Sequence, residues 1–454
     1  MKIKVSGNAI IGLLLTGSSA MSQVKNTDKV RLITLDPGHF HAALVQKTML
    51  PDLDAQVYVY APKGDDVQSH LDKITAYNER KDEPTRWKEE VYLGDDFFEK
   101  MIAEKKGNVV VMAGNNHKKT EYIKKSIDAG FNVLGDKPMA IDKAHFLMLK
   151  SAFADADKKK LVLYDIMTER YEITNILQRE FAALPQVFGT LKKGTPQHPG
   201  VEMESVHYFF KNVSGSVLTR PAWFFDVTQE GEGLQDVGVH LVDLVQWECF
   251  PDRIIDYKKD IQFNSAKRWA SDVSLSQFKA ITKQSFPAYL KKNIVQDSIL
   301  KVYSNGDVNY KLFGVNVMVT AKWAFKAVAG GDSQYAVLHG TKADLVVKQG
   351  AEENYTPVLY IEPNQTDAVY EQQLRGNLKS IQAKYPGIEL KKEGRGWTVI
   401  IPEKYKDGHE AHFGRVTEKY LDYLKNKNMP KWEVPNMIAK YYITTTALDM
   451  AKKK

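Results

Sequence analysis

Asp236 and His240 are the first pair of side chains in the sequence whose types and spacing suit proton transfer. They stand four residues apart, so they share a face if residues 233–243 form a helix. A carboxylate beside an imidazole can orient it and tune its pKa toward neutrality, which makes His240 a candidate base for a substrate hydroxyl group. A capped helix with His240 merely packed would show the same spacing.

Lys137 is the second chemical candidate, in the segment Gly-Asp-Lys-Pro at 135–138. The segment follows a short apolar run at 132–134, which predicts that Lys137 lies at the carboxyl end of a strand. A lysine there can hold a hydroxyl oxygen and stabilise the negative charge that develops as a hydride leaves. An ordinary surface turn accounts for an isolated Lys-Pro equally well.

Short apolar runs and amphipathic stretches alternate between residues 30 and 165. The runs predict strands at 30–35, 56–60, 109–112, 132–134 and 161–164, and the stretches predict helices at about 40–49, 65–80, 117–129 and 142–157. Such an order predicts right-handed βαβ units and a parallel sheet. The run at 109–112 is apolar throughout, as in a strand covered on both faces.

Longer strands with alternating polarity begin after about residue 185. Asn305-Gly306 separates two of them and predicts a hairpin turn. The expected fold class is α/β, with an N-terminal Rossmann-like, doubly wound parallel sheet and an α+β domain built on a large, mostly antiparallel sheet. The expected domains are a dinucleotide-binding domain at 28–168, a substrate and oligomerisation domain at 169–365, and a C-terminal extension at 366–454 packed on the other two.

The turn after the first strand stands where dinucleotide-binding proteins carry Gly-x-Gly-x-x-Gly. It reads Asp-Pro-Gly-His-Phe-His-Ala at 36–42 and keeps one glycine. The helix start can still offer N–H groups to a pyrophosphate. Lys63 would meet a 2′-phosphate, whereas Asp65 or Asp66 would bind a ribose diol, so NAD and NADP both remain open. The candidate cofactor-binding residues are Gly38, His39, Phe40, His41, Lys63, Asn115, Asn116 and Asp136.

His39 and His41, with His117 near the same sheet edge, also raise the alternative of a zinc site. No carboxylate or further histidine has an obvious ligand spacing. The sequence analysis therefore predicts no metal.

Three pieces of the chain, in this order and spacing, resemble the glucose–fructose oxidoreductase and inositol dehydrogenase family. The family's Glu-Lys-Pro motif is similar to residues 136–138, residues 220–226 resemble the stretch before its second motif, and that motif, Asp-x-Gly-x-His-x-x-Asp, matches Asp236, Gly238, His240 and Asp243. The resemblance covers about residues 30–350 and implies catalytic roles for Lys137, Asp236 and His240.

The chain also departs from this family in several places. The glycine loop is degenerate, Asp136 replaces the usual glutamate, and Lys119 stands where the family often has histidine. The long C-terminal extension resembles an exported bacterial subgroup. Within that extension His409, Glu410 and His412 are expected to pack rather than to line a pocket.

The expected function is the oxidation or reduction of a hydroxyl or keto group on a sugar or glycoside, with NAD or NADP tightly bound. In this hypothesis His240 takes the hydroxyl proton, Lys137 steadies the oxygen, and Asp236 orients substrate and histidine. Two alternatives stay open: a glycosidase of the same fold that uses tightly held NAD, and a non-catalytic sugar-binding protein. The candidate substrate residues are Arg170, His207, Trp223 and Asp243.

The composition narrows the partners and the compartment. The chain has 454 residues, a net charge of +7 and one cysteine, Cys249, which excludes an intramolecular disulfide. No basic stripe is interleaved with aromatic residues, so no nucleic-acid partner is expected. The family resemblance implies a homo-oligomer, either a dimer or a tetramer.

Residues 1–20 have the pattern of a signal peptide. Lys2 and Lys4 precede an apolar run at 9–15, and Ser18-Ser19-Ala20 has the form of a cleavage site. The protein is therefore expected to be exported to the periplasm. No segment is long and apolar enough for a transmembrane helix.

Overall fold

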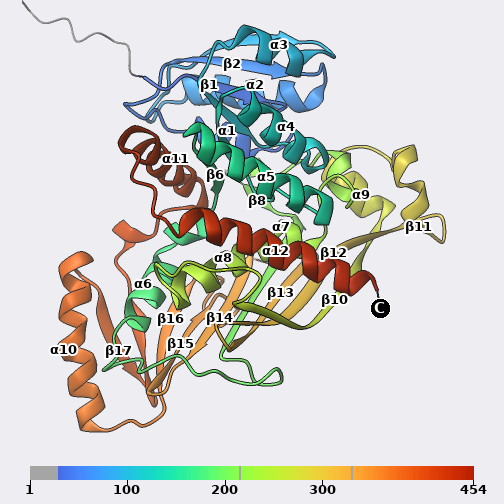
Figure 1. Ribbon diagram of the computed structural model, residues 1–454. Helices are drawn as coiled ribbons and strands as arrows, with labels where there is room; N and C mark the ends of the chain where they lie inside the picture. The colour runs from blue at the N-terminus through green and yellow to red at the C-terminus, as the bar shows by residue number, and fades with distance from the viewer. Residues whose placement is uncertain (1–28, 214–215, 329–330, 454) are drawn as a thin grey trace, which may run out of the picture.

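The computed structural model describes residues 29–213, 216–328 and 331–453, so the predicted signal peptide at 1–20 lies outside the described residues. The N-terminal part contains a six-stranded parallel sheet in the order β3-β2-β1-β4-β5-β6 (Figure 1). The strands are β1 (Leu32–Leu35), β2 (Gln56–Ala61), β3 (Lys88–Leu93), β4 (Val109–Met112), β5 (Asn132–Asp136) and β6 (Leu163–Ile166).

Helices connect these strands and cover both faces of the sheet. Every residue of β4 is buried, which explains its purely apolar sequence. The edge strand β3 is mostly exposed and carries charged residues, so its sequence gave no apolar signal and it was not predicted. The connecting helices are α1 (His41–Val45), α2 (Asp65–Glu79), α3 (Phe97–Glu104), α4 (Asn116–Asp128) and α5 (Lys143–Lys159).

A second, ten-stranded sheet follows, in the order β10-β12-β13-β7-β14-β15-β16-β18-β17, with β11 beside β12. Only β7 and β13 pair in parallel, and the other pairs of this sheet are antiparallel. The predicted α/β fold class, with one parallel and one mostly antiparallel sheet, is confirmed. The strands are β7 (Val201–Phe210), β10 (Ile261–Ser274), β11 (Ile294–Val295), β12 (Ile299–Leu312), β13 (Val315–Lys326), β14 (Ser333–His339), β15 (Ala343–Lys348), β16 (Val358–Pro363), β17 (Glu389–Glu393) and β18 (Gly396–Ile400).

The predicted hairpin turn at Asn305-Gly306 is wrong, because β12 runs straight through both residues. The Asn305 side chain instead accepts a hydrogen bond from the backbone N–H of Trp323 on β13. A Cβ atom at Gly306 would lie 2.9 Å from Leu234, so the glycine permits close packing of a helix on the sheet. Gly306 therefore allows a helix to pack closely on the strand and does not form a turn.

The connecting segments of the second part form several short helices and turns. Of these, α7 packs on β12, and α8 packs on β7 and β13. The elements are the 3₁₀ turns η1 (Thr168–Tyr171), η2 (Ala222–Phe225) and η3 (Ala288–Asn293), the helices α6 (Ile173–Ala182), α7 (Gly233–Asp236), α8 (Gly238–Cys249) and α9 (Leu275–Thr282), and the small pair β8 (Asn212–Val213) and β9 (Ser216–Val217).

The C-terminal residues join the two sheets. The helix α12 packs on α5 of the first part and on α7, α8 and β10 of the second (Figure 1). Its buried Met437 and Tyr441 belong to the core of the first part, whereas Ile443 and Ala447 belong to that of the second. The elements of this region are α10 (Ala368–Lys384), the 3₁₀ turn η4 (Glu403–Tyr405), α11 (His409–Asn426) and α12 (Glu433–Lys452).

A search of the described helices finds none with the length and apolar character that a membrane crossing requires.

Candidate active site

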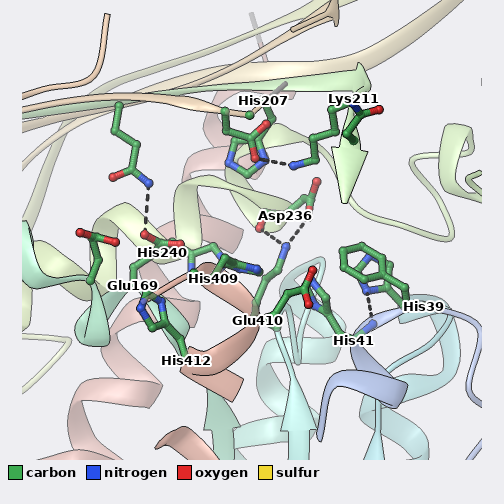
Figure 2. Close-up of a pocket in the computed structure, with 18 of the residues that line it drawn as sticks. His39, His41, Glu169, His207, Lys211, Asp236, His240, His409, Glu410 and His412 are labelled. Atoms are coloured by element: carbon green, nitrogen blue, oxygen red, sulfur yellow. Dashed lines mark hydrogen bonds and ion pairs between the residues drawn. The ribbon is translucent and has the colours of Figure 1, made fainter. Parts of the chain in front are cut away.

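A cavity of about 590 Å³, called the first cavity below, lies between the carboxyl edge of the parallel sheet and the second sheet (Figure 2). The turn before α1, the end of β5 and the start of α11 form one side of it. The strand β7 and the helices α7 and α8 form the other. A position at the carboxyl ends of parallel strands is where open α/β sheets bind ligands.

Lys137 and Asp236 form a buried ion pair in the first cavity. The Lys137 Nζ atom lies 2.6 Å from Asp236 Oδ1 and also donates to the backbone oxygen of Asp236 at 2.9 Å. Burial opposes the charge of Lys137, yet the carboxylates of Asp236 and Asp136 outweigh it and raise the pKa of the lysine. Lys137 therefore carries a positive charge at neutral pH. A cis peptide bond joins it to Pro138.

His240 lines the same cavity as a neutral imidazole. Burial, followed by the positive charge of Lys137, lowers the pKa of His240 well below its usual range. Its Nδ1 atom is buried and has no hydrogen-bond partner among the described residues. An imidazole in this state can accept a proton from a ligand.

The predicted single helix through Asp236 and His240 is wrong. The helix is interrupted at Val237. The short α7 ends at Asp236, and the longer α8 contains His240. The first cavity still brings the two side chains together, but through two helices. The carboxylate of Asp236 is hydrogen-bonded to Lys137 and makes no hydrogen bond to the imidazole of His240.

Arg170 and Asp243, two predicted substrate residues, are joined in a buried charge network. The guanidinium of Arg170 holds both carboxylate oxygens of Asp243, at 2.6 and 2.7 Å, and also donates to Glu433 of α12. Lys440 of α12 adds bonds of 2.7 Å to Asp243 and to Asp165. Neither Arg170 nor Asp243 lines a described cavity, so the network links the parts of the chain rather than facing a ligand.

The other two predicted substrate residues lie in different places. His207 lines the first cavity, where its Nδ1 atom is 3.3 Å from Asp332 and burial lowers its pKa to about 4. Trp223 lies outside the first cavity and donates from its indole nitrogen to Asp66 at 2.8 Å.

A second cavity, of about 930 Å³, contains several of the predicted cofactor residues. Gly38, Lys63 and Asp66 line it from the parallel sheet, and Trp223 lines it from η2. The two cavities share four wall residues, so they adjoin along the sheet edge. The shared residues are His39, Phe40, Arg220 and Phe224.

The turn at 36–42 has few backbone N–H groups free to bind a dinucleotide. The backbone N–H of Gly38 already donates to Asp36, and that of His39 donates to Ala113. A Cβ atom at Gly38 would lie 3.1 Å from Asp66 and 3.2 Å from Trp223, so both side chains cover the turn. Together the two cavities have room for a dinucleotide, but the glycine turn offers few free N–H donors for a pyrophosphate.

Asn115 and Asn116 support the structure around the turn instead of lining a cavity. Asn115 caps α4 by accepting from the backbone of His117, and its amide donates to Gln229. Asn116 donates to the backbone oxygen of Glu230 and accepts from the buried Lys119. These bonds join the first part of the chain to the loop before α7.

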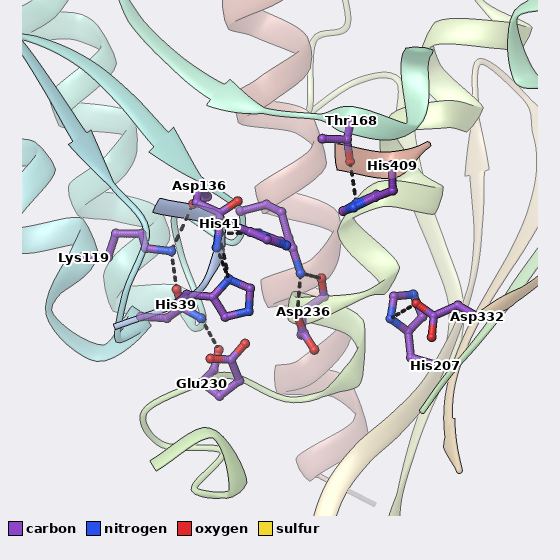
Figure 3. Close-up of polar contacts among 12 residues, drawn as sticks. His39, His41, Lys119, Asp136, Thr168, His207, Glu230, Asp236, Asp332 and His409 are labelled. Atoms are coloured by element: carbon purple, nitrogen blue, oxygen red, sulfur yellow. Dashed lines mark hydrogen bonds and ion pairs between the residues drawn. The ribbon is translucent and has the colours of Figure 1, made fainter. Parts of the chain in front are cut away.

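Asp136 lies beside the histidines of the turn. The Nδ1 atoms of His41 and His39 are 2.9 and 3.7 Å from Asp136 Oδ2 (Figure 3). His117, which the sequence analysis placed near this group, is exposed on α4 and does not join it. Burial lowers the pKa of His39 and of His41 well below the usual range, so both rings are neutral.

The C-terminal extension supplies wall residues that the sequence analysis expected only to pack. His409, Glu410 and His412 at the start of α11 line the first cavity. Glu169, Lys211 and Asp332 line it as well and were not predicted. None of these residues lies in a motif, and no signal in the sequence links α11 to a turn near residue 40.

Comparisons with known proteins agree with this fold. Residues 177–452 match the family described as "Putative oxidoreductase C terminal domain". A crystal structure of a "putative oxidoreductase" from Parabacteroides merdae ATCC 43184 is 55% identical with a TM-score of 0.91 and covers 94% of this chain and 98% of that chain. No curated protein matches the chain.

Two more distant structures share the fold alone. The 3-ketoreductase KijD10 from Actinomadura kijaniata, in complex with NADP and TDP-benzene, has a TM-score of 0.54 at 12% identity, covering 91% of this chain and 96% of that chain. A protein of Sinorhizobium meliloti 1021 assigned as a myo-inositol dehydrogenase has a TM-score of 0.53 at 12% identity, covering 94% and 98%. The resemblance to the inositol dehydrogenase family is confirmed in the fold, and this chain belongs to the oxidoreductase family that carries this C-terminal domain.

Proposed function

We propose that the protein is a nicotinamide-dependent oxidoreductase that interconverts a hydroxyl group and a keto group on a sugar or glycoside. The observation that carries this proposal is the buried Lys137–Asp236 pair beside the neutral His240, in a cavity at the carboxyl edge of a parallel sheet. An ammonium group and a neutral imidazole in one cavity are the groups that removal of a hydroxyl proton requires.

Each residue of this group has a separate task. His240 accepts the proton of the substrate hydroxyl, and the charge of Lys137 stabilises the oxygen that becomes negative. Asp236 holds the lysine in place through its 2.6 Å contact. The chemistry that a nicotinamide ring supplies when bound is hydride exchange with the carbon that carries this oxygen.

The two adjoining cavities support the proposal that the protein binds a dinucleotide. Lys63 and Asp66 would hold its adenosine end, and His39 and Phe40 would line its middle. Binding requires that Asp66 exchange its hydrogen bond with Trp223 for one with the ribose. The NADP complex of KijD10, which has the same fold, supports a nicotinamide cofactor of this kind.

The decisive experiment is a titration of the purified protein with NADH and NADPH, followed by turnover assays that combine NAD+ or NADP+ with a panel of glycosides. We expect saturable binding of one dinucleotide and substrate-dependent formation of the reduced cofactor. Asp236→Asn should retain dinucleotide binding and lose turnover, since it removes the partner of Lys137 alone. If neither dinucleotide binds at millimolar concentration, the enzyme hypothesis fails and a sugar-binding role remains.

We further propose that the protein is exported and works as a homo-oligomer. The sequence pattern of residues 1–20 supports export, and the family resemblance supports a dimer or tetramer. The N-terminal sequence of protein recovered from the periplasm should begin near residue 21, and light scattering should give two or four times the chain mass. An uncleaved chain in the cytoplasm contradicts the first proposal, and a monomer contradicts the second.

A further inference from the structure

His39, His41 and Asp136 bring three potential metal ligands to one point. Both histidines lie in the turn after β1, and Asp136 ends β5. The strand β4 is the only strand between β1 and β5, so their carboxyl ends lie close together. One ligand atom from each of the three side chains lies within 4.8 Å of the other two (Figure 3).

Hydrogen bonding does not account for the way His39 faces Asp136. The backbone N–H of His41 points at the Nδ1 atom of His39 from 3.4 Å, so this nitrogen accepts and carries a lone pair. The same nitrogen faces Asp136 Oδ2 at 3.7 Å. These two acceptor atoms lie near one another with no proton between them, because Asp136 Oδ2 is hydrogen-bonded to His41 Nδ1 at 2.9 Å instead. A cation among the three side chains would relieve this arrangement.

Asp136 supplies a second, independent observation. The residue is only 2% exposed, and its Oδ1 atom has no hydrogen-bond partner among the described residues. Buried carboxylate oxygens are almost always bonded, and an ion is one of the few reasons for an exception. The neighbouring Lys137 does not use this carboxylate, because its Nζ atom is bonded to Asp236.

We propose that His39, His41 and Asp136 bind a divalent transition-metal ion. Two imidazoles and one carboxylate suit ions such as Zn²⁺, Mn²⁺ or Co²⁺, whereas Mg²⁺ and Ca²⁺ prefer oxygen ligands alone. Three protein ligands are typical of a site that keeps positions open for a further ligand. The sequence analysis expected no metal because the spacing of residues did not reveal Asp136 as a partner of the turn.

The open positions of this ion face the first cavity. His39, His41, Lys137 and Asp236 all line it, so a ligand oxygen at Lys137 has the metal site beside it. The chemical class of ligand is therefore a hydroxyl or keto oxygen of the molecule that fills the cavity, which the ion would bind as a Lewis acid. Metal binding itself requires no nicotinamide, so the inference goes beyond the proposed function.

Metal binding can be measured directly on the purified full chain. After treatment with a chelator, Co²⁺ is added and its visible absorption recorded, and Zn²⁺ content is measured after equilibrium dialysis. We expect about one ion per chain, with a cobalt spectrum of low coordination number. Wild-type protein that binds no stoichiometric Co²⁺ or Zn²⁺ overturns the proposal, whatever the variants do.

Variants then locate the site. His39→Gln and Asp136→Asn should each weaken Zn²⁺ binding by at least about 100-fold, because loss of even a group behind a ligand costs 10- to 100-fold. His117→Gln is the matched control, since this exposed histidine lies nearby on α4 and should leave binding unchanged. Equal binding by the ligand variants and the control places the ion elsewhere and overturns the proposal.

These assays contain no dinucleotide, so their failure is distinct from a failure of the proposed function. Where a ligand variant does not fold, the thermal shift of wild-type protein with Zn²⁺ decides. A ligand that binds the folded state raises Tm with its concentration. A shift that Zn²⁺ produces equally in wild-type and in the folded ligand variant contradicts the site.

Discussion

Replacing Lys440 with methionine should destabilise the protein strongly, because this lysine joins three parts of the chain. It lies on α12, its side chain is fully buried, and its Nζ atom is 2.7 Å from both Asp165 and Asp243. Asp165 belongs to the parallel sheet and Asp243 to α8. Methionine keeps the volume of the side chain and removes its charge.

The structure gives the expected magnitude. Removing one partner of a buried ion pair costs about 3–5 kcal/mol, since the other charge stays buried and uncompensated. Asp243 keeps both contacts with Arg170 in the variant. Among the described residues, the carboxylate of Asp165 keeps only the hydroxyl of Tyr441, at 3.0 Å, so most of the loss should fall on Asp165.

Urea unfolding followed by circular dichroism measures this loss. The midpoint for Lys440→Met should fall while the slope with denaturant stays constant, which marks a change in stability alone. Lys452→Met is the control on the same helix, because Lys452 is half exposed and lies 3.8 Å from Glu232. Such a pair is worth at most about 1 kcal/mol.

A double variant tests the cause. Asp165→Asn combined with Lys440→Met removes the uncompensated carboxylate and should recover a large part of the lost stability. The reasoning is refuted if Lys440→Met unfolds within about 1 kcal/mol of wild type at an unchanged slope, or if the double variant is less stable than the single one.

Three further predictions concern the site and its surroundings. Asp236→Asn should lower turnover at least about 100-fold under the proposed function, and His117→Gln should leave it unchanged; equal steady-state rates would contradict the role of Asp236. Trp223→Phe frees Asp66 from its 2.8 Å bond and should tighten dinucleotide binding by up to about 10-fold, so a weaker affinity in the titration argues against a ribose at Asp66. Burial raises the pKa of Glu89 from 4.5 to about 7, so the folded chain holds this proton more tightly and the unfolding free energy falls as pH rises through that interval. Glu89→Gln should remove this fall, at most about 3 kcal/mol, and identical pH profiles for variant and wild type would contradict the assignment.

The sequence predicted those features that depend on local patterns. Apolar strands separated by helices led to the parallel sheet, because buried strands need a continuous apolar sequence. Lys137 was found from its place at the end of β5, and Asp236 and His240 from a motif. The structure brings these three to one cavity, although α7 and α8 replace the single expected helix.

Contacts between distant segments were beyond such patterns. Nothing near Arg170 or Asp243 shows that Glu433 and Lys440 of α12 complete their charge network. Asn305-Gly306 has the composition of a turn, but the approach of α7 to β12 decides its conformation. Asp136 gave no sign of its partners because 95 residues separate it from His41. Burial and long-range pairing are tertiary properties that a linear pattern records only weakly.

The use of α11 to finish the first cavity has a consequence for the newly made chain. Phe413, Val416 and Tyr420 of α11 belong to the core of the parallel-sheet part, and the ring of Phe413 lies 4.6 Å from that of His41. Synthesis at about 5–20 residues per second delivers α11 roughly 20–70 seconds after the turn that it covers. During that interval the first part exposes apolar surface, and the helix whose first turn completes the cavity also sets how long the nascent protein needs protection from aggregation.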